Sequence, residues 1–79
     1  MLDRKQLGER LRIARQRMNM SQLELSLALE EQDIKLNQTA IGKMERGERN
    51  MYVHQLVAFA EVLDVSVGWL LEGGDISIP

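Results

Sequence analysis

Apolar residues recur along this chain three or four positions apart, which is the spacing of one face of a helix. The first stripe of this kind consists of Leu7, Leu11, Ala14 and Met18. Asn19 follows it and is of a residue type that readily takes the left-handed conformation at a helix end. The chain has one Pro, at its last position, and six Gly. Because helix-breaking residues are so few, the pattern predicts an amphipathic helix as the first element.

The second predicted helix has a clear start. Ser21 and Glu24 have the spacing of a capping box, in which the serine oxygen accepts a hydrogen bond from the N–H three residues on and the glutamate reaches back to the serine N–H. We expect this helix to run from about Gln22 to Glu31. Its inward residues are expected to be Leu25, Ala28 and Leu29.

A third helix follows a short polar connection that ends at Asn37, a favourable N-cap residue. We expect it from about Gln38 to Glu45, with Ile41 and Met44 one turn apart on its inward side. Gly47 is the expected C-terminal glycine. The outward side is then formed by Gln38, Thr39, Gly42, Lys43 and Arg46.

Two more helices complete the pattern. The fourth is expected from about Val53 to Leu63, without a clear cap at its start. Ser66 caps a short fifth helix that runs to Leu71, and Gly73-Gly74 stops it. The core residues expected from the fourth helix are Val53, Leu56, Phe59, Ala60 and Leu63. No strand pattern occurs, so the sequence predicts an all-α domain of five short helices.

A chain of 79 residues has room for one core, and we expect one domain over residues 1–73 with a C-terminal tail over residues 74–79. There is no cysteine and one histidine, His54. This composition excludes a disulfide framework and a thiolate metal site and argues against a histidine-based metal centre. No apolar run approaches the roughly 20 residues that span a bilayer. The expectation is a soluble, cytoplasmic domain without cofactor or metal.

Charge is distributed unevenly along the chain, although the net charge is only -2. Residues 1–49 carry all ten basic residues and eight acidic ones, which gives +2. Residues 50–79 carry four acidic residues and no Lys or Arg, which gives -4. A domain that is basic at one end can present a positive face to a nucleic acid despite its acidic total.

The second and third predicted helices have the plan of a helix-turn-helix that reads DNA, because the later one opens with small polar residues and turns Gln, Thr and Lys outward. Further motifs accompany it in order: Arg15, Ser21-Gln22, Ile41…Glu45-x-Gly47 and Val65-Ser-Val-x-Trp-Leu-Leu71. Over residues 7–73 the chain resembles the lambda-repressor-like family, also called the XRE or Cro-repressor type. The resemblance implies a compact five-helix domain with a helix-turn-helix formed by helices two and three.

The resemblance implies base-reading functions for three residues. Gln38 and Thr39 match the first residues of the family's recognition helix, which reach base edges in the major groove. Lys43, one turn on, matches another base-reading position. The side-chain chemistry agrees, since Gln can pair with adenine, Lys with guanine, and the Thr methyl group can contact a thymine methyl group.

Other residues match positions next to the DNA backbone, or a structural pair, in the family. The expected phosphate contacts are made by Gln22, Arg46, the N–H of Gly47, and Arg49. Gln22 is also expected to brace the recognition helix. Arg15 and Glu45 match a buried ion pair that ties the first helix to the third.

The sequence departs from the family pattern in two ways. The connection between helices two and three is about five residues longer than the usual tight turn and lacks its glycine. Leu23 and Leu27 also occupy positions that are usually polar and exposed. We expect the longer connection to fold back so that Ile34 and Leu36 cover these two leucines. The alternative is that Leu23 and Leu27 form a surface for a partner.

The sequence therefore predicts a sequence-specific regulator of transcription that binds double-stranded DNA, is nucleoid-associated in a prokaryote or phage setting, and acts by repression. It would bind as a homodimer to a palindromic operator. No catalytic constellation is present, so an enzyme is not expected. The expected dimer surface consists of Val67, Leu70, Ile76 and Ile78. The alternative from another class is a protein-interaction module, such as an antitoxin or an antirepressor-like partner, which the extra leucines and the acidic second half favour.

Overall fold

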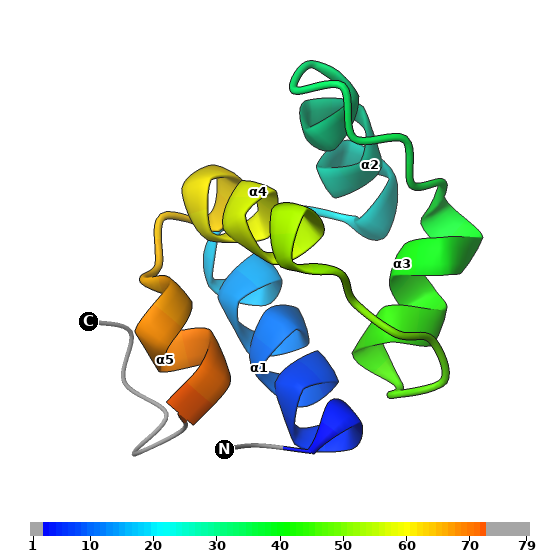
Figure 1. Cartoon of the computed structure of the whole chain (residues 1–79). Helices are drawn as coiled ribbons and strands as arrows, with labels where there is room; N and C mark the ends of the chain where they lie inside the picture. Colours follow the sequence, from blue (N-terminus) through cyan, green and yellow to red (C-terminus); the bar gives the residue numbers. More distant parts are fainter. Residues whose placement is uncertain (1–2, 73–79) are drawn as a thin grey trace.

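The computed structural model describes residues 3–72, and this part of the chain folds into five helices without a strand (Figure 1). The helices are α1 (Arg4–Arg17), α2 (Gln22–Glu30), α3 (Gln38–Glu45), α4 (Val53–Leu63) and α5 (Val67–Glu72). The predicted all-α, five-helix fold is confirmed, and α3 and α4 have the predicted bounds. The expected helix stop at Gly73-Gly74 and the expected tail lie outside the described residues. No helix within residues 3–72 is long and apolar enough to cross a membrane.

Hydrogen bonds at the helix starts explain where the helices begin. Ser21 and Glu24 form the predicted capping box, with the Ser21 Oγ accepting from the Glu24 N–H at 3.0 Å and the Glu24 Oε1 accepting from the Ser21 N–H at 2.9 Å. The side chain of Asn37 caps α3 as predicted. A further capping box, absent from the sequence expectations, opens α1 between Asp3 and Gln6. Each cap satisfies N–H groups that have no partner inside the helix.

The helix ends also follow local chemistry. Asn19 has a φ of 55° after α1, in agreement with the prediction, and Gly47 has a φ of 76° after α3. Asp64 ends α4 with a φ of 55°, a conformation that Asp tolerates better than most residues. These three left-handed residues set the directions in which the chain leaves its helices.

The hydrophobic core lies around α1, which packs against α3, α4 and α5, while α2 packs against α3 and α4. In Figure 1, α1 stands between α5 on one side and α3 on the other, with α4 across them. The largest side chains that are fully buried are Leu11, Leu25, Leu29, Ile41, Met44, Phe59, Leu63 and Leu70. All five helices contribute at least one of these side chains, so the fold holds together as one core.

Arg10 fixes α5 against α1. Its guanidinium lies 4.6 Å from the centre of the Trp69 ring, and its Nη1 donates to the Trp69 carbonyl oxygen at 3.4 Å. Both side chains are buried. Stacking of a cation on an aromatic face is attractive, and more so where water is excluded. Trp69 is therefore a core residue.

Two residues expected in the core are exposed, Met18 and Val53. α1 ends at Arg17, so Met18 is the C-cap residue and no longer continues the apolar stripe of the helix. Val53 is the first residue of α4 and lies about a quarter turn from the side that Leu56 and Phe59 bury, at roughly 100° per residue. Ala28 is half-buried. Helical periodicity identified the apolar stripes correctly. It did not show at which residue of each stripe burial begins or ends.

The expectation that Ile34 and Leu36 cover Leu23 and Leu27 is wrong. Leu23 and Leu27 are 52% and 55% exposed. The connection instead passes beside Ser26, whose Oγ donates to the Leu36 carbonyl oxygen at 2.6 Å. Leu36 is buried in the core and Ile34 packs against it. The two leucines therefore remain on the outer surface of α2.

Close packing of α1 on α3 depends on Gly8. A Cβ atom on this residue would lie 2.2 Å from the carbonyl oxygen of Met44 and 2.6 Å from that of Glu45. Such backbone atoms cannot move aside as the end of a flexible side chain can. Any residue larger than glycine would therefore push the two helices apart.

We expect Gly8→Ala to lower the free energy of unfolding by about 1–3 kcal/mol, because it forces extra volume into a packed contact. Gly68 in α5 is a matched control, since the nearest heavy atom to its added Cβ is the Ser66 Oγ at 3.9 Å. Gly68→Ala should be neutral or stabilising by up to about 1 kcal/mol through helix propensity. Urea unfolding measures both variants. Equal stability of Gly8→Ala and the unaltered chain would contradict the described packing of α1 on α3.

Candidate nucleic-acid interface

The outer side of α3 presents the three residues predicted to read bases. Gln38, Thr39 and Lys43 are exposed, whereas Ile41 and Met44 on the opposite side are buried in the core. The apolar anchors therefore decide which way the polar side chains face. The structure brings Gln38, Thr39 and Lys43 together on one side of one helix.

Gly42, expected on the same outward face, is buried. An added Cβ would lie 3.2 Å from the Arg46 Nη1 and 3.5 Å from the side-chain amide atoms of Gln22. These two side chains therefore cover the glycine. Its lack of a side chain leaves room for Gln22 and Arg46 to lie across α3, which is the physical reason for a glycine in the middle of this helix.

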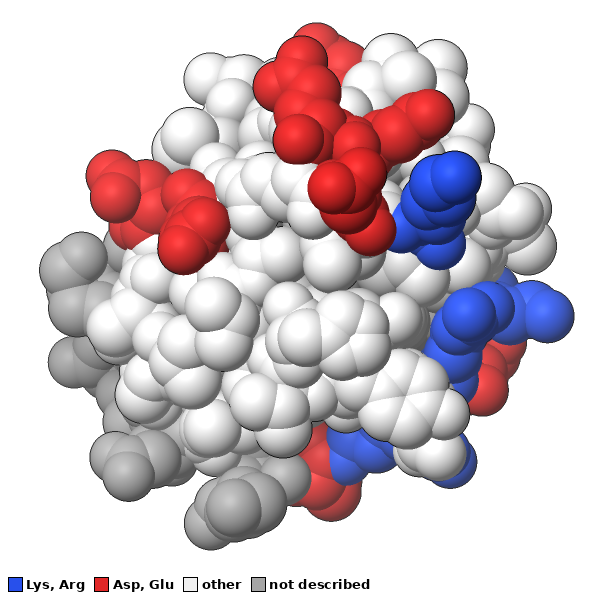
Figure 2. Space-filling view, turned by 45° about the horizontal axis from the view of Figure 1, so that its top comes forward, with Lys and Arg blue, Asp and Glu red and all other residues white. Residues whose placement is uncertain are grey.

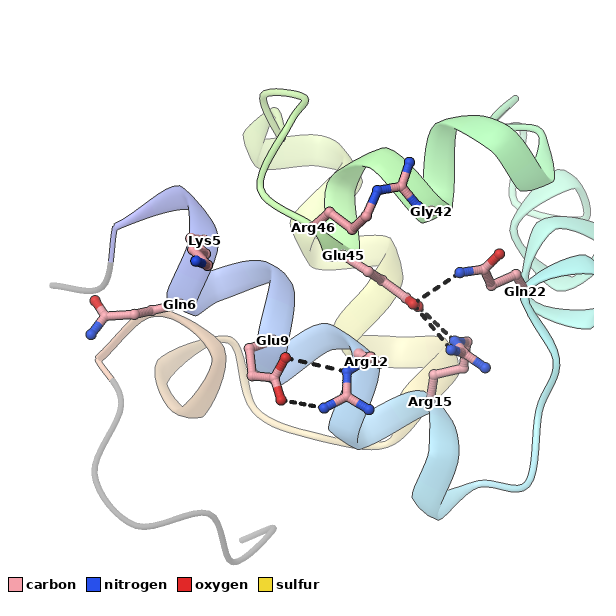
Figure 3. A pocket seen from close by; sticks show the side chains of 9 residues that line it. All are labelled: Lys5, Gln6, Glu9, Arg12, Arg15, Gln22, Gly42, Glu45 and Arg46. Atoms are coloured by element: carbon pink, nitrogen blue, oxygen red, sulfur yellow. Dashed lines mark hydrogen bonds and ion pairs between the residues drawn. The ribbon is translucent and has the colours of Figure 1, made fainter.

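Arg15 of α1 and Glu45 of α3 form a two-bond ion pair (Figure 3). The Arg15 Nε donates to the Glu45 Oε2 at 2.6 Å, and the Arg15 Nη2 donates to the Glu45 Oε1 at 3.0 Å. The two side chains are 11% and 3% exposed. Such paired geometry suits a guanidinium and a carboxylate and gives direction as well as attraction.

The same ion pair carries two further hydrogen bonds. The third nitrogen of Arg15, Nη1, donates to the Met20 carbonyl oxygen at 2.8 Å, just before α2. The Gln22 Nε2 donates to the Glu45 Oε1 at 3.1 Å (Figure 3). One network therefore joins α1, the start of α2 and the end of α3. It fixes the position of Gln22 beside the reading side of α3.

The residues predicted to contact phosphate lie around this network. Arg46 and Arg49 are exposed after the end of α3, and Gln22 is half-buried at the start of α2. The Arg46 Nε donates to Glu48 at 3.2 Å in a surface ion pair. The N–H of Gly47 donates to the Met44 carbonyl oxygen at 3.1 Å, which closes the helix. The side chains of Gln22, Arg46 and Arg49 are therefore better placed to reach a ligand than the Gly47 N–H is.

A cavity of about 600 Å³, which was not predicted from the sequence, opens between α1 and α3 (Figure 3). On the α1 side it is lined by Lys5, Gln6, Glu9 and Arg12, and on the other by Gln22 and Arg46. Lys5, Glu9 and Arg12 are three or four positions apart, so they follow one stripe of α1. That polar stripe was visible in the sequence, but its closeness to Gln22 and Arg46 depends on the packing of α1 on α3.

Glu9 and Arg12 form an exposed ion pair on this stripe. The Arg12 Nε donates to the Glu9 Oε2 at 3.2 Å, and the Arg12 Nη2 contacts the other carboxylate oxygen. The hydrogen bonds from Arg12 lower the pKa of Glu9, and those to Glu9 raise the pKa of Arg12. Both groups are therefore charged at neutral pH and offset each other's charge.

The prediction of a dimer surface is wrong at Leu70. Leu70 is fully buried, because α5 turns this side chain into the core. Val67 is half-buried and packs against the core. Ile76 and Ile78 lie outside the described residues. Leu70 is therefore not available for a dimer contact.

The arrangement of α2 and α3 around a buried brace, with polar side chains facing out, defines a helix-turn-helix protein. The helix-turn-helix family model matches residues 11–70, which is more than half of the chain. The protein belongs to the lambda-repressor-like helix-turn-helix family of DNA-binding transcriptional regulators, which are not enzymes. A comparison with curated protein sequences found no match.

Two solved structures show the same fold. The restriction-modification controller protein C.AhdI from Aeromonas hydrophila is 28% identical, with a TM-score of 0.74, over 85% of this chain and 90% of that one. The DNA-binding domain of BldD is 31% identical, with a TM-score of 0.71, over 86% of this chain and 92% of that one. The likeness thus extends over nearly the whole of both relatives' chains.

We expect Glu45→Gln to lower the free energy of unfolding by about 3–5 kcal/mol, because it leaves the buried Arg15 charge without a counter-charge. Glu9→Gln is the control on the exposed pair of α1 and should change this free energy by less than about 1 kcal/mol. Urea unfolding of the two variants gives the comparison. If both substitutions lower the free energy of unfolding by the same small amount, Glu45 is solvated rather than buried.

Proposed function

We propose that this protein is a sequence-specific regulator that binds double-stranded DNA as a homodimer and represses transcription from a palindromic operator. The observation that carries the proposal is the fixed polar side of α3. Gln38, Thr39 and Lys43 are exposed on a helix whose other side is buried and whose end is tied to α1 and α2. A helix held in this way can enter the major groove as a rigid unit.

Each of the three side chains supports base recognition. Gln38 offers an acceptor and a donor that can pair with adenine, and Lys43 offers a donor for guanine O6 and N7. The Thr39 methyl group can contact the methyl group of thymine. Different positions along α3 would therefore read different base pairs of one half-site.

Contacts to the DNA backbone would orient α3 in the groove. Gln22 is held beside α3 by Glu45, and Arg46 lies across Gly42. Arg49 shares a shallow depression with Lys43 and Asn50 beyond the end of α3. We assign Gln22, Arg46, Arg49 and the Gly47 turn to the phosphates that flank the bases. Such contacts fix orientation without reading sequence.

The proposed dimer rests on the size of the module, and the proposed regulatory function is in keeping with its relatives. A single small helix-turn-helix offers few base contacts, and two half-sites about one helical turn apart multiply them. C.AhdI is described as a restriction-modification controller, and the related part of BldD as a DNA-binding domain. A dimer bound across a promoter would block polymerase.

One observation favours a second function. Leu23 and Leu27 remain exposed on α2, on a helix that also carries Glu24 and Glu30. An apolar pair flanked by acidic groups suits a protein partner, as in an antitoxin or an antirepressor-like complex. This function predicts a stable complex with another protein and DNA binding that disappears at physiological salt.

Selection of bound duplexes from a random pool, at low and at physiological salt, tests the main proposal. We expect an inverted-repeat consensus that survives the higher salt. Purely electrostatic binding would instead be lost there without a consensus, because released counter-ions make it strongly dependent on salt. Such a loss would overturn the proposal and favour the protein-partner function.

Two substitutions separate base reading from phosphate contact on the selected duplex. Lys43→Ala should cost about 1–3 kcal/mol of binding free energy and relax the preference at one position of each half-site. Arg46→Ala should weaken binding to all sequences alike and reduce the dependence of affinity on salt. Quantitative binding to the consensus and to single-position variants measures both. An equal loss on every sequence for Lys43→Ala would assign Lys43 to the phosphates.

A further inference from the structure

The outward strip of α4 is apolar and uncovered within the described part of the chain. Val53 and Val57 are one helical turn apart and are 77% and 43% exposed. Tyr52, just before the helix, is 62% exposed. Its ring stacks on that of His54, with centroids 6.1 Å apart and the rings inclined by 8°. We call these four residues, Tyr52, Val53, His54 and Val57, the α4 face.

Charged residues stand only at the two ends of this face. Arg49 precedes it, and Glu61 follows Val57 by one turn on the same side of α4, with Asp64 as the C-cap residue. Figure 2 shows a broad surface without charged side chains, with Asp and Glu at its upper and left edges and both charge signs at its right and lower edges. At the N-terminal end of the α4 face, Arg49 stands beside Glu48, which is paired with Arg46, and the C-terminal end carries Glu61 and Asp64.

We propose that a second copy of this chain occupies the α4 face, so that two α4 helices pack antiparallel across a twofold axis. A twofold contact uses the same patch on both chains, so the patch must complement itself. With the axis between Val53 and Val57, each Val53 packs on the partner's Val57. Each Arg49 then lies toward the partner's Glu61. The proposal rests on the homodimer of the proposed function and replaces the contradicted surface at Leu70.

The other exposed apolar pair on the described surface does not complement itself. Leu23 and Leu27 lie on α2, whose charged residues are Glu24 and Glu30. A twofold contact through these leucines would bring carboxylates of the two chains together without a basic residue of α2 to offset them. Like charges placed opposite each other cost several kcal/mol at an interface. Charge thus favours self-association through α4 rather than α2.

The position of the α4 face also suits a DNA-binding dimer. Residues 46–52 connect the end of α3 directly to the start of α4, so a contact through α4 is separated from the reading helix by one short connection. The two α3 helices of the dimer would then be held at a fixed spacing. A fixed spacing is what a palindrome with two half-sites requires.

Matched substitutions on the two helices test which one carries the contact. Val57→Glu places a charge in the proposed contact, and Leu27→Glu places the same charge on a comparably exposed aliphatic position of α2. Sedimentation equilibrium over a range of protein concentrations gives the mass, and circular dichroism verifies folding. We expect a two-chain mass for the unaltered chain and for Leu27→Glu. For Val57→Glu we expect the dimer dissociation constant to rise more than about tenfold.

A charge exchange tests the antiparallel arrangement. Arg49→Glu and Glu61→Arg should each weaken the dimer, because each sets like charges against one another. An equimolar mixture of these two variants should regain the two-chain mass, since each chain supplies the charge that the other needs. Recovery on mixing cannot come from a general loss of stability in the single variants.

Several results would overturn the α4 contact: a one-chain mass for the unaltered chain, dissociation by Leu27→Glu but not by Val57→Glu, or no recovery in the mixture. These measurements contain no DNA and therefore fail separately from the proposed function. A palindromic consensus together with a dimer that Val57→Glu leaves intact would keep the regulator and reject the α4 face. A dimer that Val57→Glu dissociates but that selects no duplex would keep the α4 face and reject the regulator.

Discussion

A buried guanidinium and a buried carboxylate hold α3, the proposed reading helix, in place. Glu45 lies at the end of α3, and Arg15 of α1 binds both of its oxygens while also bonding the chain just before α2. A buried charge that loses its partner is costly, so α3 cannot rotate or slide without breaking the pair. Gly8 acts with this constraint, because it lets the backbones of α1 and α3 approach until the two charges meet. The direction of the polar side of α3 is thus a consequence of buried chemistry on its other side.

This arrangement divides the surface into regions with different chemistry. The polar side of α3, the start of α2 and the turn after α3 combine hydrogen-bonding side chains with Arg46 and Arg49. The α4 face is apolar and charged only at its ends, whereas the exposed leucines of α2 lie among acidic groups. A chain with a net charge of -2 can still present positive charge locally, because Lys43, Arg46 and Arg49 are exposed on and just after α3. The uneven distribution of charge along the chain also places Arg49 before α4 and Glu61 and Asp64 at its C-terminal end.

Most of the fold could be predicted from sequence, because its signals are local. The capping box at Ser21 and the caps at Asn37 and Ser66 depend on residues three positions away, and all three are present. Predictions failed where burial depends on distant packing: Val53 is exposed, Leu70 is buried, and the connection leaves Leu23 and Leu27 uncovered. For the site, the outward residues of α3 follow from periodicity. The covering of Gly42 and the cavity beside α1 could not be predicted from periodicity, because both arise from helices that meet only in the folded chain.

The most direct test of this account is a map of the protein surface that meets DNA. Amide chemical shifts of the isotope-labelled chain, followed by NMR during titration with the selected duplex, report the contact residue by residue. We predict that the largest changes fall on residues 38–43 of α3, on Ser21 and Gln22, and on the turn at residues 46–50. The account would be contradicted if the largest changes lay around Leu27 in α2, or along α5, while the amides of α3 stayed unchanged.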